Sequence, residues 1–192
     1  MKAIKTLAFV IAVMTVVAQL YVPTSMAKRY ADILNTGESY RFKVVPRDPA
    51  DPFKGRYVRL TFPIDTGKIR DLNSKPDLIR MLKRNDTAYA ILEKATDNSA
   101  KIVDLQKSAP ANGDYVKIKM SYHSQNNYRI KLPFNRYYAE ENKAPKIEAL
   151  IWQDRQNERE FYADVRVKDG YGVIEELYVE GVPILDYLKQ TQ

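Results

Sequence analysis

The pattern of hydrophobic and polar positions divides the chain into an apolar start and a longer, alternating remainder. Two lysines, Lys2 and Lys5, precede an almost unbroken apolar run from Thr6 to Val22. At 17 residues, the length of this run is intermediate between that of the apolar core of a secretory signal and that of a helix that crosses the bilayer, which needs about 20 residues. We therefore expect the first residues to reach a membrane.

The residues that follow allow two outcomes for this segment. Ser25-Met26-Ala27 places small residues where a signal peptidase cuts, so cleavage after Ala27 is one outcome. Tyr21 can anchor at the interface, and residues 28–34 can continue as a helix on the headgroups. We favour an uncleaved anchor with the amino terminus inside, although Lys28 and Arg29 weaken the positive-inside argument.

Beyond the anchor, apolar and polar residues alternate with period two, which is typical of half-buried strands. The clearest pair spans residues 113–123 and 127–134, which predict an antiparallel hairpin. The same pattern predicts strands at 39–46, 56–63, 87–95 and 100–106, and a final hairpin over 160–181 that turns at Lys168-Asp169-Gly170.

Two segments have helical spacing instead. One begins at Ser74 as N-cap and places Leu78, Ile79 and Leu82 on one face. The other begins near Asn142, with Ala144, Ile147, Leu150 and Ile151 on one face. We predict an α+β fold, mainly antiparallel β, with about eight strands in an open or barrel-like arrangement and two short helices. Residues 1–27 form the anchor or signal segment, and residues 28–192 form one exported domain.

Composition excludes several classes of function. The chain has no cysteine, which removes disulfides and thiolate chemistry. Its net charge is +7, but basic residues are spread among acidic ones, which indicates a solvated mixed surface. No basic tract is interleaved with stacking aromatics, so we expect no nucleic-acid partner.

The residues that usually carry catalysis are sparse. His123 is the only histidine, which disfavours a metal site, and Asp48 and Asp51 lack the glycine and ligand count of a calcium loop. The nucleophile-elbow, phosphate-loop and dinucleotide motifs are absent from the sequence. The adjacent Glu140 and Glu141 face opposite ways on an extended segment, which argues against a carboxylate pair. We expect neither metal nor cofactor.

One motif carries a resemblance. A loop with three prolines, residues 46–54, leads into Gly55-Arg56-Tyr57-Val58-Arg59-Leu60-Thr61-Phe62. This segment resembles the naming motif of the GDYXXLXY family of bacterial proteins, with Arg56 in place of aspartate and Phe62 in place of the last tyrosine. The resemblance extends over most of the chain, including residues 132–150. It implies a membrane-associated protein of uncharacterised function, and it transfers no catalytic residue.

The motif has two interpretations. It can be a turn that leads into a strand, or it can form a binding surface, because rigid charged loops often carry binding sites. The candidate binding residues are Arg47, Asp48, Asp51, Gly55, Arg56, Tyr57 and Arg59, together with Arg136, Tyr137 and Tyr138.

We therefore hypothesise an inner-membrane, single-pass protein that contacts lipid through residues 6–22. Its domain lies on the periplasmic side and binds a partner, such as a polytopic membrane protein. The competing hypothesis is a periplasmic hydrolase of peptide or glycan with a serine or carboxylate nucleophile. A serine–lysine dyad is formally available to it.

Overall fold

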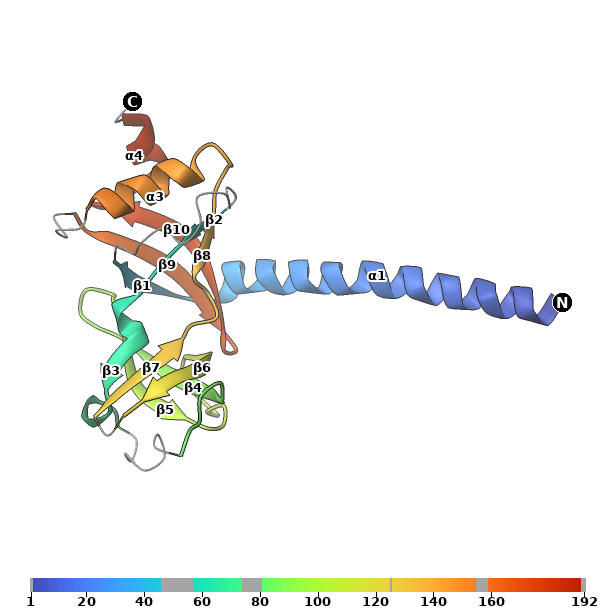
Figure 1. Ribbon diagram of the computed structural model, residues 1–192, viewed down its shortest axis with the longest axis horizontal. Helices are drawn as coiled ribbons and strands as arrows, with labels where there is room; N and C mark the ends of the chain where they lie inside the picture. The colour runs from blue at the N-terminus through green and yellow to red at the C-terminus, as the bar shows by residue number, and fades with distance from the viewer. Residues whose placement is uncertain (1, 46–56, 74–80, 125, 155–158, 191–192) are drawn as a thin grey trace.

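The computed structural model describes residues 2–45, 57–73, 81–124, 126–154 and 159–190. A long helix, α1 (Lys2–Thr36), projects from the middle of a β-rich body, at a right angle to the long dimension of that body (Figure 1). The described residues form eleven strands and two further helices, α3 (Ala144–Gln153) and α4 (Ile184–Gln190). The predicted α+β class with mainly antiparallel β structure is confirmed.

The projecting part of α1 is apolar all round rather than amphipathic, as expected for a helix surrounded by lipid. Its side chains are exposed from residue 9 to residue 24, and residues 9–36 are long and apolar enough to cross a membrane. The hydroxyls of Thr15, Thr24 and Ser25 donate to carbonyls three or four residues earlier in the helix. These polar groups are therefore satisfied within the helix.

The last turns of α1 are fixed to the body of the protein. Ile33 is buried, and the Lys168 ammonium contacts the Asp32 carboxylate at 2.8 Å. The helix ends at Thr36, and at the next residue, Gly37, an added Cβ would lie 2.4 Å from the Ile33 carbonyl oxygen and 3.1 Å from that of Val167. Only glycine allows this close approach between helix and sheet. The predicted continuation of the helix over residues 28–34 is confirmed.

The helix docks on a four-stranded antiparallel sheet with the order β1-β9-β10-β11. Its strands are β1 (Glu38–Val44), β9 (Phe161–Lys168), β10 (Tyr171–Val179) and β11 (Val182–Pro183). Asp169 and Gly170 both have positive φ, 50° and 81°, which makes the two-residue turn between β9 and β10 a type I′ turn. A bulge between Ile174 and Glu176 then shifts the register of β10.

A second antiparallel sheet has the order β3-β7-β6-β4-β5. Its strands are β3 (Thr66–Lys68), β4 (Thr87–Lys94), β5 (Ala100–Gln106), β6 (Tyr115–His123) and β7 (Asn127–Lys131). The predicted hairpin is confirmed as β6 and β7, and the predicted strands 87–95 and 100–106 pair with each other as β4 and β5. The Lys117 amide donates to the Gly170 carbonyl at 2.8 Å, so the tip of the β9–β10 hairpin touches β6 and joins the two sheets.

A two-stranded ribbon joins β2 (Tyr57–Arg59) to β8 (Arg136–Tyr138). The strand predicted over residues 56–63 is shorter in the structure, where its described part ends at Arg59. The chain then enters a 3-10 turn at Pro63–Asp65. Just beyond β2, Thr61 forms a bridge with Val45, next to the end of β1. This bridge links the ribbon to the β1 side of the four-stranded sheet.

Both sheets and the ribbon contribute to one hydrophobic cluster. At its centre, the rings of Phe42, Phe62 and Phe134 meet edge to face with centroids 5.1–5.8 Å apart. Helix α3 covers part of the core with its predicted apolar face, from which Ile147 and Ile151 are buried. The helix expected from Ser74 lies largely outside the described residues.

Candidate functional site

The structure brings together two candidate segments that are far apart in the sequence. Strands β2 and β8 pair antiparallel, with Tyr57 opposite Tyr138, Val58 opposite Tyr137, and Arg59 opposite Arg136. The sequence of either strand alone does not predict this pairing, because three residues are too few for a recognisable strand pattern. Arg47, Asp48, Asp51, Gly55 and Arg56, the other candidates, lie outside the described residues.

The two faces of the ribbon have different characters. Val58 and Tyr137 point into the core, with 1% and 7% of their surface exposed. The other four side chains, Tyr57, Arg59, Arg136 and Tyr138, share the opposite face. We call these four residues the ribbon face. Its tyrosine rings lie 6.0 Å apart, and the Arg136 guanidinium lies 4.8 Å from the centre of the Tyr57 ring.

The two arginines of the ribbon face place two positive charges side by side. Arg59 and Arg136 are direct cross-strand neighbours, and both are exposed. Like charges at such positions destabilise a sheet by about 0.2–1 kcal/mol. Among the described residues, neither guanidinium has a carboxylate partner within ion-pair distance. A bound carboxylate would therefore remove a repulsion as well as add an attraction.

Tyr137 has a different role from its neighbours on β8. Its hydroxyl donates to the Glu176 carboxylate at 2.7 Å, which ties β8 to β10. Burial, together with this hydrogen bond, raises the pKa of the Tyr137 phenol above its ordinary value. The side chain therefore stays neutral and holds the ribbon in place, while its two neighbours remain available at the surface.

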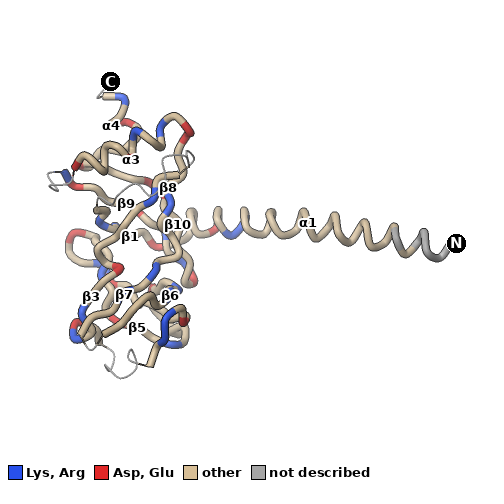
Figure 2. The backbone as a smooth tube through the Cα atoms, in the orientation of Figure 1, with Lys and Arg blue, Asp and Glu red and all other residues tan. Residues whose placement is uncertain are grey.

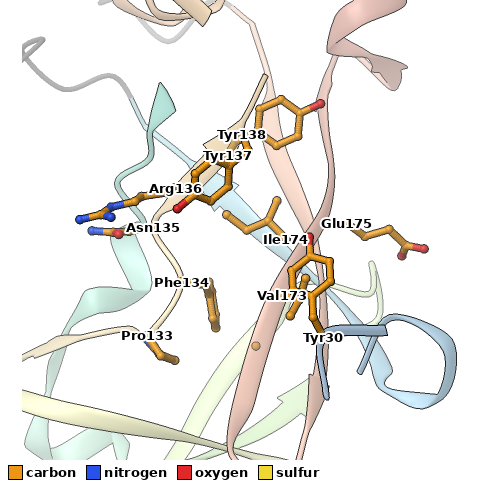
Figure 3. Close-up of a pocket in the computed structure, with 11 residues that line it drawn as sticks. Tyr30, Pro133, Phe134, Asn135, Arg136, Tyr137, Tyr138, Val173, Ile174 and Glu175 are labelled. Atoms are coloured by element: carbon orange, nitrogen blue, oxygen red, sulfur yellow. The ribbon is translucent and has the colours of Figure 1, made fainter. Parts of the chain in front are cut away.

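A cleft of about 520 Å³ opens beside the ribbon. One side is formed by the segment Pro133–Tyr138 and the other by Gly172–Glu175 of β10, with Tyr30 of α1 at the edge (Figure 3). Phe134 packs directly on Gly172, where an added Cβ would lie 2.2 Å from the ring. The cleft thus lies between β8 and β10, at the base of the projecting helix.

The surroundings of the helix base carry charges of both signs (Figure 2). A second hollow, of about 460 Å³, is lined by Lys28, Arg29 and Asp32 of α1 together with Lys168 and Tyr171 of the β9–β10 hairpin. The Arg29 guanidinium lies 4.9 Å from the centre of the Tyr171 ring. Basic and aromatic side chains of this kind suit the headgroup region of a bilayer.

In the described part of the chain, the side chains that could act in catalysis or hold a metal do not form a cluster. Among the described residues, no three His, Cys, Asp or Glu side chains are close enough to hold a metal ion. His123 ends β6 on the other sheet, and Glu140 forms an ion pair with Lys143 at 2.7 Å. Neither these residues nor Glu141 line the cleft between β8 and β10.

The sequence predicted the ribbon residues of the site but not the opposite wall of the cleft. Tyr30, Gly172 and Ile174 were not among the candidates, because only the tertiary fold places them near β8. The sequence signal for Tyr30 is its position, as a tyrosine that follows soon after an apolar run.

These features define a class of protein: a mainly antiparallel α+β body carried on one N-terminal apolar helix of membrane-spanning length. The chain belongs to the GDYXXLXY family, because the family model described as "GDYXXLXY protein" matches residues 19–177, most of its length. No curated protein and no solved structure matches the chain.

The family motif is divided between the surface and the core. Tyr57 lies on the ribbon face, whereas Leu60 and Phe62 are almost fully buried, with 3% and 1% exposed. The phenylalanine at position 62 joins two other phenylalanines and needs no hydrogen-bond partner. This departure from the motif suits the apolar cluster in which it lies.

Proposed function

We propose that this protein is a single-pass inner-membrane protein whose domain, on the periplasmic side, binds a membrane partner through the ribbon face. The observation that carries the proposal is a pair of exposed arginines, flanked by tyrosines, that has no carboxylate partner among the described residues and lies beside the base of a membrane-length helix. Arginine and tyrosine are enriched at protein–protein interfaces and dominate their binding energy.

The dimensions of α1 support the anchor. Residues 6–27 carry no charged side chain. Twenty-two helical residues extend roughly 33 Å, close to the roughly 30 Å hydrocarbon layer. Lys28 and Arg29 then begin the segment that docks on the body. Lipid contact along residues 6–22 would cover the side chains of residues 9–22, which are exposed in the structure.

The docked end of α1 also supports an uncleaved anchor. Ser25-Met26-Ala27 lies inside a continuous helix, and the following residues are held by Ile33 and the Asp32–Lys168 ion pair. Mass measurement of the mature amino terminus in native membranes tests this point. We expect an intact start, and a chain beginning at Lys28 would establish the cleaved, secreted alternative.

The side of the membrane is testable because the chain lacks cysteine. A single Lys146→Cys substitution, at an exposed position of α3, gives one thiol on the domain. In cells with a permeabilised outer membrane, a maleimide that cannot cross the inner membrane should label it. Labelling that requires lysis would place the domain in the cytoplasm.

Partner binding is tested by photo-crosslinking in native membranes. A benzophenone amino acid replaces Tyr138 in one variant and Tyr122, on the distant five-stranded sheet, in its control. The two tyrosines are similarly exposed, at 68% and 59%. We expect a defined adduct from position 138 and not from position 122, and we expect Arg59→Glu to reduce it. Equal adducts from both positions, or none from either, would refute the proposal.

The hydrolase alternative gains no support from the described residues, because His123, Glu140 and Glu141 do not line the cleft. The partner proposal accounts for the exposed arginines and tyrosines without requiring them to act on a bond.

A further inference from the structure

The strands on either side of the cleft each have an edge that no other strand in the described part of the chain pairs with. Strand β8 pairs with β2 on one side, and the part of β10 before its bulge pairs with β9 on one side. Among the described residues, no backbone hydrogen bond joins β8 to β10. The Tyr137–Glu176 hydrogen bond and the packing of Phe134 on Gly172 bridge this junction through side chains instead. We call this junction the seam.

The register shows which backbone groups point into the seam from β8. The Leu60 amide donates to the Asn135 carbonyl at 2.9 Å, so these two residues form a hydrogen-bonded pair. Hydrogen-bonded and non-bonded pairs alternate along an antiparallel ladder. Val58 and Tyr137 are therefore bonded to each other, whereas the N–H and C=O groups of Arg136 and Tyr138 point away from β2 and toward the seam.

The same reasoning applies to β10. The two-residue turn at Asp169-Gly170 is closed by a hydrogen-bonded pair, Lys168 and Tyr171. The next bonded pair is Arg166 with Val173, so the backbone groups of Gly172 and Ile174 point away from β9. Both residues line the cleft. Two strand edges with alternating donors and acceptors thus face the same cavity.

Unpaired edges are normally protected, because they invite pairing with another chain. The β8 edge has no lysine, proline or bulge; its exposed residues are Arg136 and Tyr138, types that favour binding. The cleft, at about 520 Å³, has room for a few residues of extended peptide. It also lies beside Tyr30 on α1, where a neighbouring membrane protein would leave the bilayer.

We propose that the seam binds an extended segment of the membrane partner, which adds as a strand to the β8 edge. This mode of recognition obtains affinity from main-chain hydrogen bonds and specificity from alternate side chains. The segment carries a carboxylate opposite Arg59 and Arg136, since these guanidinium groups have no acidic partner in the described part of the chain. The inference rests on the proposed function, and it specifies how the partner is held.

The test separates a backbone hydrogen bond from a side-chain contact. A benzophenone amino acid at Tyr30 reports adduct formation in native membranes, in backgrounds that carry Arg136→Pro or Arg136→Ala. Both lose the arginine side chain, but only proline loses the N–H that faces the seam, which an edge position tolerates. We expect the proline adduct to be about fivefold weaker than the alanine adduct, the effect of one hydrogen bond. Tyr138→Pro and Tyr138→Ala form a second matched pair.

A second measurement needs no variant and applies if the proline substitutions impair folding. The adduct is mapped, and a synthetic peptide covering the mapped segment is added to the full-length protein in lipid nanodiscs. Amide hydrogen exchange should slow at Arg136 and Tyr138. The Tyr137 amide, already bonded to Val58, should be slow with and without peptide.

The outcomes distinguish the two proposals. Equal adducts in proline and alanine variants that both fold, or peptide binding without protection at Arg136 and Tyr138, would overturn strand addition and leave the partner function intact. If no adduct forms from Tyr30 or from Tyr138 in the wild-type background, the partner function fails, and strand addition fails with it.

Discussion

The aromatic cluster at the centre of the core allows a quantitative test of the family motif. Phe62 is 1% exposed, and its ring meets those of Phe42 and Phe134 edge to face at 5.7 and 5.8 Å. The motif has tyrosine at this position. A Phe62→Tyr substitution would add a hydroxyl to a side chain surrounded by apolar rings, without changing the ring itself.

The expected cost follows from burying a polar group without a partner. Such a hydroxyl costs about 1–3 kcal/mol in protein mutational data. A loss of about 2 kcal/mol is roughly a 30-fold change in the folding equilibrium and lowers the melting temperature by about 4–8 °C for a chain of this size. The effect is large enough to measure and small enough to leave the protein folded.

The assay is thermal unfolding of the full-length protein in detergent, followed by the fluorescence of Trp152. This is the only tryptophan, and it lies on α3, so the signal reports the β-rich body and not α1. Tyr138→Phe is the matched control: it removes a hydroxyl from a side chain that is 68% exposed, and it should change stability by less than about 0.5 kcal/mol. A Phe62→Tyr protein as stable as the wild type would show that the ring edge reaches a polar group or water, contrary to the packing described above.

Three further predictions concern the ribbon and the helix. Tyr137→Phe should cost about 1.5–3 kcal/mol in the same melting assay, because the Glu176 carboxylate loses the Tyr137 hydroxyl and keeps the Leu177 amide as a donor. Since the pKa of Tyr137 is raised in the folded state, its contribution is complete below pH 10 and is lost as pH rises further; the variant should therefore lose less stability than the wild type between pH 9 and 11. Arg136→Gln relieves the repulsion with Arg59 but loses the contact with the Tyr57 ring, so it should change stability by less than about 0.5 kcal/mol in melting experiments while weakening the adduct from position 138; unchanged adduct yield would argue against a role in binding. Ile33→Asp should release the end of α1 from the sheet and speed tryptic cleavage at Lys28 and Arg29, whereas equal rates in both proteins would mean that this contact does not hold the helix.

Much of the fold could be predicted because most of its strands are long enough for a period-two pattern. The strands with five to nine residues, such as β4 and β6, were all expected. Strands β3, β8 and β11 were not, because two or three residues contain no complete period. Helix α4 was also missed; it follows β11 with only seven residues, too few to show a periodic face.

The candidate site was predicted in part, for a related reason. The charged and aromatic side chains around Tyr57 and around Arg136 indicate a candidate binding segment in each place, but not that the two segments meet. Their pairing, and the cleft beside them, depend on contacts between residues far apart in the sequence, such as the bond between Tyr137 and Glu176. Local pattern carries no information on such contacts. The inward orientation of Tyr137 likewise follows from alternation only once β8 is known to be a strand.

The position of the motif explains why one short sequence can serve both the fold and a binding surface. Along a strand, successive side chains face opposite sides, so a segment of eight residues supplies two sets of positions. Tyr57 and Arg59 face outward beside β8, while Val58 and Leu60 face the core, and Phe62 meets the aromatic cluster after the chain leaves β2. A change at an inward position therefore alters stability first, and a change at an outward position alters binding first. Melting and crosslinking measurements on the same variants should separate these two sets, and any outward variant that lost both properties equally would show that the ribbon face contributes to folding as well.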